Sequence, residues 1–284
     1  MGLKRIIRKV AKFIVFEQPK EKVVVNIAKI QHGQVLIGKN ICITGGGSGL
    51  GLAMAKKFVS EGAKVLIVGR NEEKLSKAVV EIGASASYMV FDVSDASHAE
   101  DFFVKCEEKM SASIDCFVSN AGISLHENIF TNVTLDGFDK QFNINMRGNY
   151  FLCKAFLERM LNEKNRNANL LVISSETGNQ AYDIPYGMTK AAINTMIKAF
   201  SRRVYTSGIR VNAIAPGVTL SDMTKDYADG SDGNLYRDCA SGRIFLPEEV
   251  AEVACFLLSD ASQCISGEII HTNAGNHIKT FWDK

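Results

Sequence analysis

Short apolar runs and segments of helical periodicity alternate along the chain from residue 39 onward. The runs that favour strands lie at 40–44, 64–69, 87–91, 114–119, 169–174, 209–215 and 267–271. Apolar residues recur at helical spacing in 49–61, 71–82, 96–110, 186–207 and 247–259. Strands joined through helices run parallel and are covered on both faces. The alternation therefore predicts an α/β fold with a doubly wound parallel sheet, that is, a Rossmann fold.

The 284 residues divide into one large domain and a short extension. No internal repeat, low-complexity tract or linker follows residue 39, so we interpret 39–284 as a single Rossmann-fold domain. Residues 1–38 form an N-terminal extension. Apolar side chains recur at helical spacing opposite Lys and Arg in 2–16, which predicts a basic amphipathic helix, and 23–30 are a candidate strand.

Charge is distributed unevenly between the extension and the rest of the chain. Residues 1–22 carry seven Lys and Arg against two Glu, whereas the remainder has 26 basic and 29 acidic residues. A basic amphipathic helix suits an anionic membrane surface, but the same pattern fits a helix packed on its own domain or on a neighbouring subunit. The mildly acidic body gives no reason to expect binding to nucleic acid.

The composition favours a cytoplasmic protein. No stretch reaches the ~18 to 20 apolar residues of a membrane span, and no secretory cleavage pattern is present. The seven cysteines include no Cys-x-x-Cys pair, which favours reduced and mostly buried thiols. Peripheral contact with the inner face of a membrane is an option through 2–16, and we predict no metal site.

A glycine-rich turn, Thr44-Gly45-Gly46-Gly47-Ser48-Gly49-Leu50-Gly51, joins the first strand to the first helix. Glycine permits positive φ and close approach of a ligand, and the N–H groups at a helix start attract phosphate. Packing produces such turns as well, so the motif alone is a moderate indication of a nucleotide. Its candidate cofactor-binding residues are Gly45, Gly47, Ser48, Gly49, Leu50 and Gly51.

The end of the second strand bears on the choice of nucleotide. An acidic residue there binds a ribose 2′-hydroxyl and repels a 2′-phosphate, but this chain has Gly69 followed by Arg70. A guanidinium pairs well with phosphate, so NADP(H) is preferred and NAD(H) is the second option. The competing interpretation is that Arg70 is simply solvated.

Tyr186 and Lys190 stand four residues apart on a predicted helix, so both side chains project from one face. A neighbouring ammonium stabilises phenolate, and we therefore expect the Tyr186 pKa to be lowered toward neutrality, as an acid/base pair requires. Taken alone, the pattern often occurs by chance and more commonly describes an exposed tyrosine and a solvated lysine.

The order of these motifs resembles the short-chain dehydrogenase/reductase family over residues 39–275. The family pattern Thr-Gly-x-x-x-Gly-x-Gly falls on Thr44, Gly45, Gly49 and Gly51, and Tyr-x-x-x-Lys falls on Tyr186 and Lys190. The sheet-stabilising Asn-Ala-Gly element begins at Asn120, with Ser119 in place of the commoner Asn. The resemblance further assigns these residues to the cofactor site: Asp92, Val93, Asn120, Tyr186, Lys190, Gly217 and Val218.

The resemblance also assigns the catalytic roles. It implies that Asn145 organises a proton-relay water, Ser175 donates to the substrate oxygen, Tyr186 is the acid/base, and Lys190 activates Tyr186 and binds ribose. Reduction of a carbonyl needs a hydride for the carbon and a proton for the oxygen. Ser175 and Tyr186 can both donate to that oxygen.

One departure from the family concerns the segment before Tyr186. Ser175 precedes Tyr186 by eleven residues, whereas the family more often has thirteen, so the loop 176–185 is short by about two residues. Ser174 is the alternative donor. Since only one of two successive residues at a strand end faces the site, we favour Ser175, the second serine of the family pattern.

We therefore predict an oxidoreductase that transfers a hydride between NADP(H) and a carbonyl or secondary alcohol. The segments 123–135, 176–185 and 219–245 would shape the pocket, and the polar character of the last favours a polar or sugar-like substrate, although a solvated lid would look the same. A homodimer or homotetramer is expected by resemblance. The alternative is a non-catalytic dinucleotide-binding scaffold or sensor, associated with a membrane through 2–16.

Overall fold

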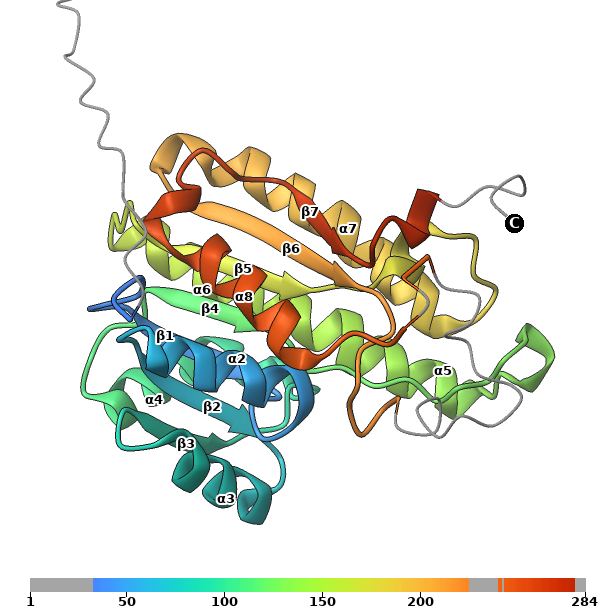
Figure 1. The fold of residues 1–284 in the computed structure, drawn as a ribbon, viewed down its shortest axis with the longest axis horizontal. Coiled ribbons are helices and arrows are strands. Elements are labelled where there is room, and N and C mark those ends of the chain that lie inside the picture. The colour runs from blue at the N-terminus through green and yellow to red at the C-terminus, as the bar shows by residue number, and fades with distance from the viewer. Residues whose placement is uncertain (1–32, 225–239, 242, 279–284) are drawn as a thin grey trace, which may run out of the picture.

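The computed structural model describes residues 33–224, 240–241 and 243–278. They form one seven-stranded sheet with the order β3-β2-β1-β4-β5-β6-β7, in which every neighbouring pair is parallel (Figure 1). The predicted doubly wound, Rossmann-type sheet is confirmed. The expected helix at 2–16 and strand at 23–30 lie outside the described residues.

The strands fall close to their expected positions. Their bounds are β1 Asn40–Thr44, β2 Lys64–Gly69, β3 Ala86–Val90, β4 Cys116–Ser119, β5 Asn169–Ile173, β6 Arg210–Pro216 and β7 Ile269–Thr272. The central strands read as continuous apolar runs because both faces of a parallel sheet are covered by helices. Alternate residues of β1 show this directly, since Ile41 and Ile43 enter one core and Cys42 enters the other.

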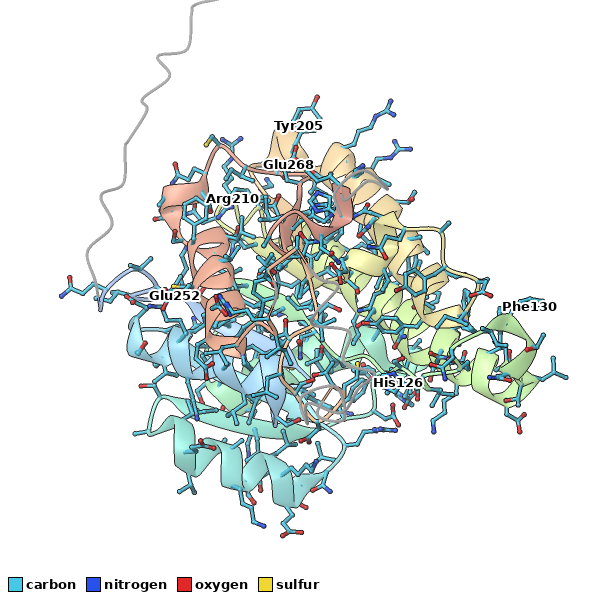
Figure 2. All side chains as sticks on the ribbon, turned by 45° about the vertical axis from the view of Figure 1, so that its right-hand side comes forward. His126, Phe130, Tyr205, Arg210, Glu252 and Glu268 are labelled. Carbon is cyan, nitrogen blue, oxygen red and sulfur yellow. The ribbon has the colours of Figure 1, made fainter. Side chains whose placement is uncertain are left out.

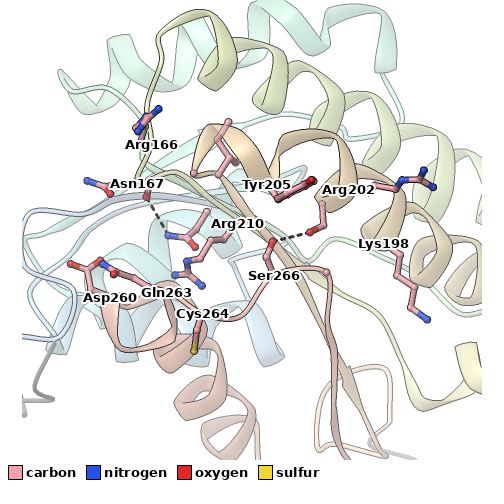
Figure 3. Close-up of a pocket in the computed structure, with 15 residues that line it drawn as sticks. Arg166, Asn167, Lys198, Arg202, Tyr205, Arg210, Asp260, Gln263, Cys264 and Ser266 are labelled. Atoms are coloured by element: carbon pink, nitrogen blue, oxygen red, sulfur yellow. Dashed lines mark hydrogen bonds between the residues drawn. The ribbon is translucent and has the colours of Figure 1, made fainter. Parts of the chain in front are cut away.

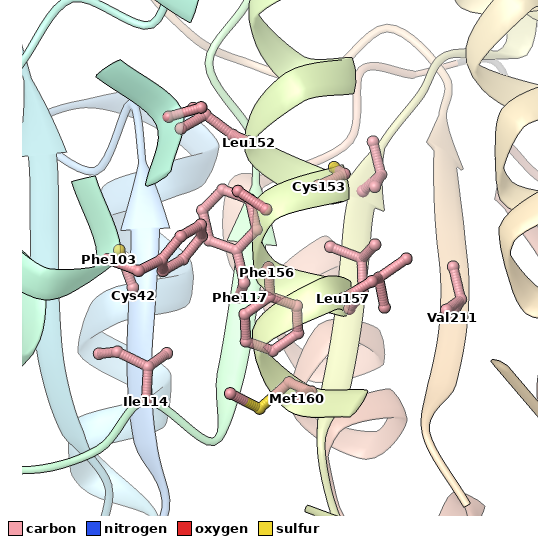
Figure 4. Packing of buried hydrophobic residues seen from close by; sticks show 14 of the residues in the cluster. Cys42, Phe103, Ile114, Phe117, Leu152, Cys153, Phe156, Leu157, Met160 and Val211 are labelled. Atoms are coloured by element: carbon pink, nitrogen blue, oxygen red, sulfur yellow. The ribbon is translucent and has the colours of Figure 1, made fainter. Parts of the chain in front are cut away.

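Helices cover the sheet in two layers. One layer holds α2 (Gly49–Ser60), α3 (Glu72–Ile82) and α8 (Pro247–Leu258), and the other holds α4 (Ala99–Met110), α6 (Asn149–Asn162) and α7 (Pro185–Val204). Figure 4 shows the core between the sheet and the layer of α4, α6 and α7. There the ring centroid of Phe117, in β4, lies 5.1 Å from that of Phe103 and 5.8 Å from that of Phe156. This aromatic packing ties α4 and α6 to the centre of the sheet.

The helical region between β4 and β5 is more elaborate than the sequence indicates. It contains α5 (Leu135–Gln141), a π-helical turn over Phe142–Gly148 and then α6. Apolar periodicity did not predict α5 or α6. The π turn between them changes the helical period, so the buried residues do not repeat at one spacing through both helices. The other helix bounds agree to within a few residues, the differences being 3₁₀ turns at 96–98 and 205–207.

Within the described ranges, no helix combines the length and apolar character that a bilayer crossing demands. The six cysteines placed there are free thiols, and five of them are buried. Burial raises the pKa of Cys116 and of Cys153 to about 12, so both thiols stay protonated at neutral pH.

Candidate active site

The carboxyl ends of the central strands bring the predicted residues to one edge of the sheet. Strand order reverses between β1 and β4, since β2 follows β1 on one side and β5 follows β4 on the other. Ligands of open α/β sheets bind in the crevice at such a switch point. The glycine-rich turn follows β1, Asn120 follows β4, Ser175 follows β5 and Gly217 follows β6.

Backbone geometry makes the turn after β1 dependent on glycine. Gly45 and Gly49 have φ of +68° and +52°, in the left-handed region. At Gly51 a Cβ would lie 2.2 Å from the carbonyl oxygen of Gly45, so no larger residue fits without moving the backbone. The first turn of α2 has no acidic side chain, and its N-cap Ser48 makes no side-chain capping bond. The turn is thus a backbone cradle that suits an anionic group.

Asn120 fixes this turn to the neighbouring strand. Its side-chain amide donates to the carbonyl oxygens of Thr44 (2.9 Å) and Gly45 (3.2 Å), and its backbone N–H donates to the Thr44 hydroxyl (3.0 Å). Ser119, which stands where the family pattern has Asn, donates its hydroxyl to the Asn149 side chain at 2.6 Å. The segment after β4 therefore supports the turn from behind.

Arg70 and Asp92 lie together beyond the ends of β2 and β3. The Arg70 guanidinium is 3.8 Å from the Asp92 carboxylate, and both side chains are largely exposed. Asp92 also accepts bonds from the backbone and hydroxyl of Ser94. Val93 is buried, and a Cβ at Gly148 would lie 2.0 Å from its carbonyl oxygen. A hollow of about 470 Å³ beside Arg70 reaches Ser94 and Arg147.

Tyr186, Lys190 and Ser175 converge at the start of α7. The Lys190 ammonium lies 5.5 Å from the centroid of the Tyr186 ring and donates to the Ile173 carbonyl at 2.9 Å. The hydroxyl of Ser175 lies close enough to the Tyr186 phenol to lower its pKa as a hydrogen-bond donor. Ser174 points elsewhere, because its hydroxyl donates to Asn194 at 2.6 Å within the core. Of the two serines, the structure therefore places Ser175 beside the phenol.

The expected direction of the Tyr186 pKa is wrong for the protein without ligands. Burial raises the pKa of Tyr186, the charges of Tyr182 and Glu176 raise it further, and only the bond from Ser175 opposes them. Burial also lowers the pKa of Lys190 to about 8. The sequence pattern correctly brought the ammonium near the phenol, but it gave no measure of desolvation, which penalises both charged forms.

Asn145 is buried at the centre of the π-helical turn. Its side chain accepts from the Ile123 backbone N–H at 2.8 Å and donates to the Ile123 carbonyl at 2.8 Å and to Thr189 at 3.3 Å. Its own carbonyl accepts from Asn149 at 2.9 Å. Asn145 thereby joins the loop after β4 to the helix that carries Lys190. Single π turns inside helices often occur at functional sites.

The segment after β6 returns over the glycine-rich turn. Gly217 donates its N–H to Thr272, and a Cβ there would lie 2.9 Å from Asn273, so this glycine permits close packing against the end of β7. Val218 accepts a backbone bond from Phe245. Ser221 reaches within 3.3 Å of the position of a Cβ on Gly49. Ser221 belongs to the segment 219–245, which the sequence predicts to shape the pocket, although no motif singles it out there.

A second hollow lies away from these residues and is not the candidate active site. It measures about 700 Å³ and includes Asn169 and Arg210, the first residues of β5 and β6, so it sits at the amino ends of the strands (Figure 3). The buried Arg210 guanidinium donates to the carbonyls of Ser259 and Ser262, which gives it a structural role. Nor does any group of three His, Cys, Asp or Glu side chains in the described ranges form a candidate metal site.

Known proteins resemble the chain over almost all of this fold. The family model described as enoyl-(acyl carrier protein) reductase matches residues 45–277. A 3-oxoacyl-[acyl-carrier-protein] reductase of Chlamydia pneumoniae is 31% identical over 246 residues, which cover 84% of this chain and 97% of that protein.

Solved structures are similar as well. Levodione reductase aligns with a TM-score of 0.79 at 28% identity, over 86% of this chain and 100% of its own. The 3-ketoacyl-(acyl-carrier-protein) reductase from Brucella melitensis, complexed with NADH, aligns with a TM-score of 0.78 at 27% identity, over 85% of this chain and 99% of its own.

Proposed function

Because the chain belongs to the short-chain dehydrogenase/reductase family of oxidoreductases, we propose that it reduces a ketone to a secondary alcohol with NADPH. The observation that carries this proposal is the contact of Ser175, Tyr186 and Lys190 at the carboxyl edge of the sheet. A purely structural tyrosine would have no need of a hydroxyl donor and a buried ammonium at the same time. Nothing in the described residues favours the alternative of a non-catalytic scaffold.

The glycine-rich turn fits a dinucleotide. Its backbone leaves no room for side chains at Gly51, and the uncapped start of α2 offers N–H groups to a pyrophosphate. Arg70, next to Gly69, is the group that would bind a 2′-phosphate, and its exposure leaves it free to exchange Asp92 for that ligand. NAD(H) is the second option, since a single exposed cation discriminates modestly. When bound, the nicotinamide ring supplies or accepts the hydride.

The side chains divide the proton chemistry among them. Tyr186 donates the proton to the developing alkoxide, and Ser175 donates a hydrogen bond to the same oxygen. Because the Tyr186 pKa is raised, the phenol is protonated at neutral pH, which suits the direction of reduction. Lys190 orients Tyr186 and returns a proton to it after each turnover. Asn145 holds the loop that faces Lys190. Gly122 of that loop is packed against both Asn145 and Lys190.

A 3-oxoacyl thioester is the first substrate to test, because relatives at 30–32% identity carry the name of 3-oxoacyl-[acyl-carrier-protein] reductase. A polar, sugar-like ketone is the second candidate, favoured by the charged residues of 219–245, of which 225–239 and 242 lie outside the described ranges. For the full chain we further predict a homodimer or homotetramer, a cytoplasmic location and membrane contact through 2–16.

The test is turnover by the full chain and by Tyr186→Phe. We expect the wild-type protein to oxidise NADPH in the presence of a 3-oxoacyl thioester or a keto-sugar, measured by loss of reduced-nicotinamide absorbance. Removing the phenol should lower kcat by about 10²- to 10⁴-fold. Tyr205→Phe is the matched control, because Tyr205 is 63% exposed at the other end of α7.

In Figure 2 Tyr205 and Glu268 lie together near the top of the view, away from His126 in the loop after β4. Tight NADPH binding without turnover on any ketone would contradict the proposal. Full activity of Tyr186→Phe would remove the phenol from its assigned role, whatever the substrate.

A further inference from the structure

The short 3₁₀ turn that follows the candidate catalytic serine is held by the C-terminal end of the described fold. This turn, η4, spans Glu176–Asn179. The Glu176 side chain is buried, and its carboxylate accepts from the amides of Asn273 (3.0 Å) and Asn276 (3.1 Å). These partners follow Glu176 by 97 and 100 residues. A buried carboxylate requires such bonds, since leaving it without partners is costly.

The other end of η4 is tied to the same C-terminal segment. Asn179 is hydrogen-bonded to His271, and the ring of His271 stacks on that of His277 with centroids 3.7 Å apart and an interplanar angle of 9°. His277 in turn contacts the Asn273 side chain at 3.0 Å. Together these contacts close a ring from Glu176 through Asn273, His277 and His271 to Asn179. We call residues 271–277 the C-terminal clamp.

The clamp acts next to the groups assigned to catalysis. Ser175 is the N-cap of η4, and its hydroxyl accepts the backbone N–H of Thr177 at 3.2 Å. The same hydroxyl opposes the rise of the Tyr186 pKa. Movement of η4 would therefore move Ser175. The turn packs on α7, since a Cβ at Gly178 would lie 2.9 Å from the Lys190 backbone. Among the described residues, Tyr182 and Glu176 act electrostatically on Tyr186, and the Lys190 ammonium lies 5.5 Å from its ring centroid. Glu176 is the acidic one of these.

We propose that Glu176 is a positioning residue: held by Asn273 and Asn276, it fixes the turn that carries Ser175 and keeps a carboxylate within electrostatic reach of the Tyr186 phenol. The inference rests on the proposed function for the roles of Ser175 and Tyr186. A negative charge near a phenol opposes its ionisation, so Glu176 helps to keep Tyr186 in the proton-donating form. The clamp thus couples the end of the fold to the proton donor.

Glu176→Gln separates the charge from the structural tie. The amide oxygen of Gln can accept the same two bonds from Asn273 and Asn276, so the turn keeps its anchor while the negative charge is lost. Glu176→Ala removes both. Glu268→Gln is the matched control, because Glu268, labelled in Figure 2, is an exposed glutamate at the amino end of β7. Tyr186, by contrast, lies in the first turn of α7, which follows the carboxyl end of β5.

The first measurement needs neither substrate nor turnover. Ultraviolet difference titration of the full chain follows phenolate absorbance, and subtraction of the matching Tyr186→Phe protein isolates the contribution of Tyr186. In Glu176→Gln the Tyr186 phenolate should appear at lower pH than in wild type, whereas Glu268→Gln should leave the midpoint where it is. An unchanged midpoint in Glu176→Gln would overturn the electrostatic half of the proposal.

The second measurement concerns the positioning half. With an accepted ketone, Glu176→Ala should lose about tenfold or more in kcat with little change in NADPH affinity, because the proton donors are misplaced. Glu176→Gln should recover most of that loss at acidic pH, while its alkaline limb moves to lower pH. Equal activity and equal pH profiles in all three proteins would overturn the inference. If the wild type turns over no ketone, the proposed function fails, and the titration still decides the effect of Glu176 on Tyr186.

Discussion

The candidate site has two halves, the glycine-rich turn and the surroundings of Tyr186, and they differ in what sets their geometry. Around the glycine-rich turn, geometry is set by the backbone: positive φ at Gly45 and Gly49 and the absence of a Cβ at Gly51. Around Tyr186, geometry is set by polar side chains of Ser175, η4, α7 and the C-terminal clamp. A backbone site is encoded locally, whereas a side-chain network depends on contacts between residues far apart in the chain.

The largest effect is expected from breaking the backbone half at Gly51. Gly51→Ala forces a methyl group to within 2.2 Å of the Gly45 carbonyl oxygen, so the turn must move. We expect NADPH binding to fall below detection, or the chain to fail to fold, because a backbone carbonyl cannot move aside as a side chain can. Isothermal titration with NADPH and thermal unfolding measure the two outcomes.

Gly47→Ala is the matched control for Gly51→Ala. A Cβ at Gly47 would meet the Leu75 side chain at 3.4 Å, an ordinary contact, and Gly47 is not among the residues of positive φ. We expect it to bind NADPH far more tightly than Gly51→Ala does. Equal losses at the two positions would show that the turn is not limited by its backbone.

An intermediate effect is expected from the paired serines at the end of β5, which sharpen the contrast within the side-chain half. Ser175→Ala removes the hydroxyl beside Tyr186 and should lower kcat by about 10²- to 10³-fold, the loss typical of one hydrogen-bond donor to a developing oxyanion. Ser174→Ala removes a buried bond to Asn194 and should cost about 1 kcal/mol of stability with little loss of kcat.

Steady-state kinetics and chemical denaturation of the two serine variants check these expectations. The reverse result, in which Ser174→Ala is inactive and Ser175→Ala turns over normally, would exchange the assigned roles. That would also mean that η4 adopts another conformation when substrate binds.

The smallest effect is expected at Arg70, the one position where the backbone half relies on an exposed side chain. Arg70→Ala should raise the Kd for NADPH about tenfold, equivalent to about 1.4 kcal/mol, and leave the Kd for NADH nearly unchanged. Competition titrations with both cofactors provide the measurement, and added salt should shrink the difference. Parallel losses for NADPH and NADH would mean that Arg70 does not read the 2′-phosphate.

Much of the fold follows from periodicity alone. The runs at 40–44 and 64–69 are β1 and β2 to the residue, and α2, α3 and α8 differ from their expected bounds by no more than one residue at either end. Strands buried on both faces and helices with one apolar face carry strong local patterns. The helices within Leu135–Asn162 were harder to predict from periodicity, because a π turn interrupts the helical period there.

The sequence by itself determined the order of the strands and helices, the glycine-rich turn and the four-residue spacing that puts Tyr186 and Lys190 on one face of α7. Only the tertiary structure decided that Ser175 rather than Ser174 meets Tyr186, that burial raises the pKa of that phenol, and that Glu176 is held by Asn273 and Asn276. Spacing and backbone freedom are local properties that a sequence states directly. Desolvation and the partner of a buried polar group depend on what the rest of the chain packs against it.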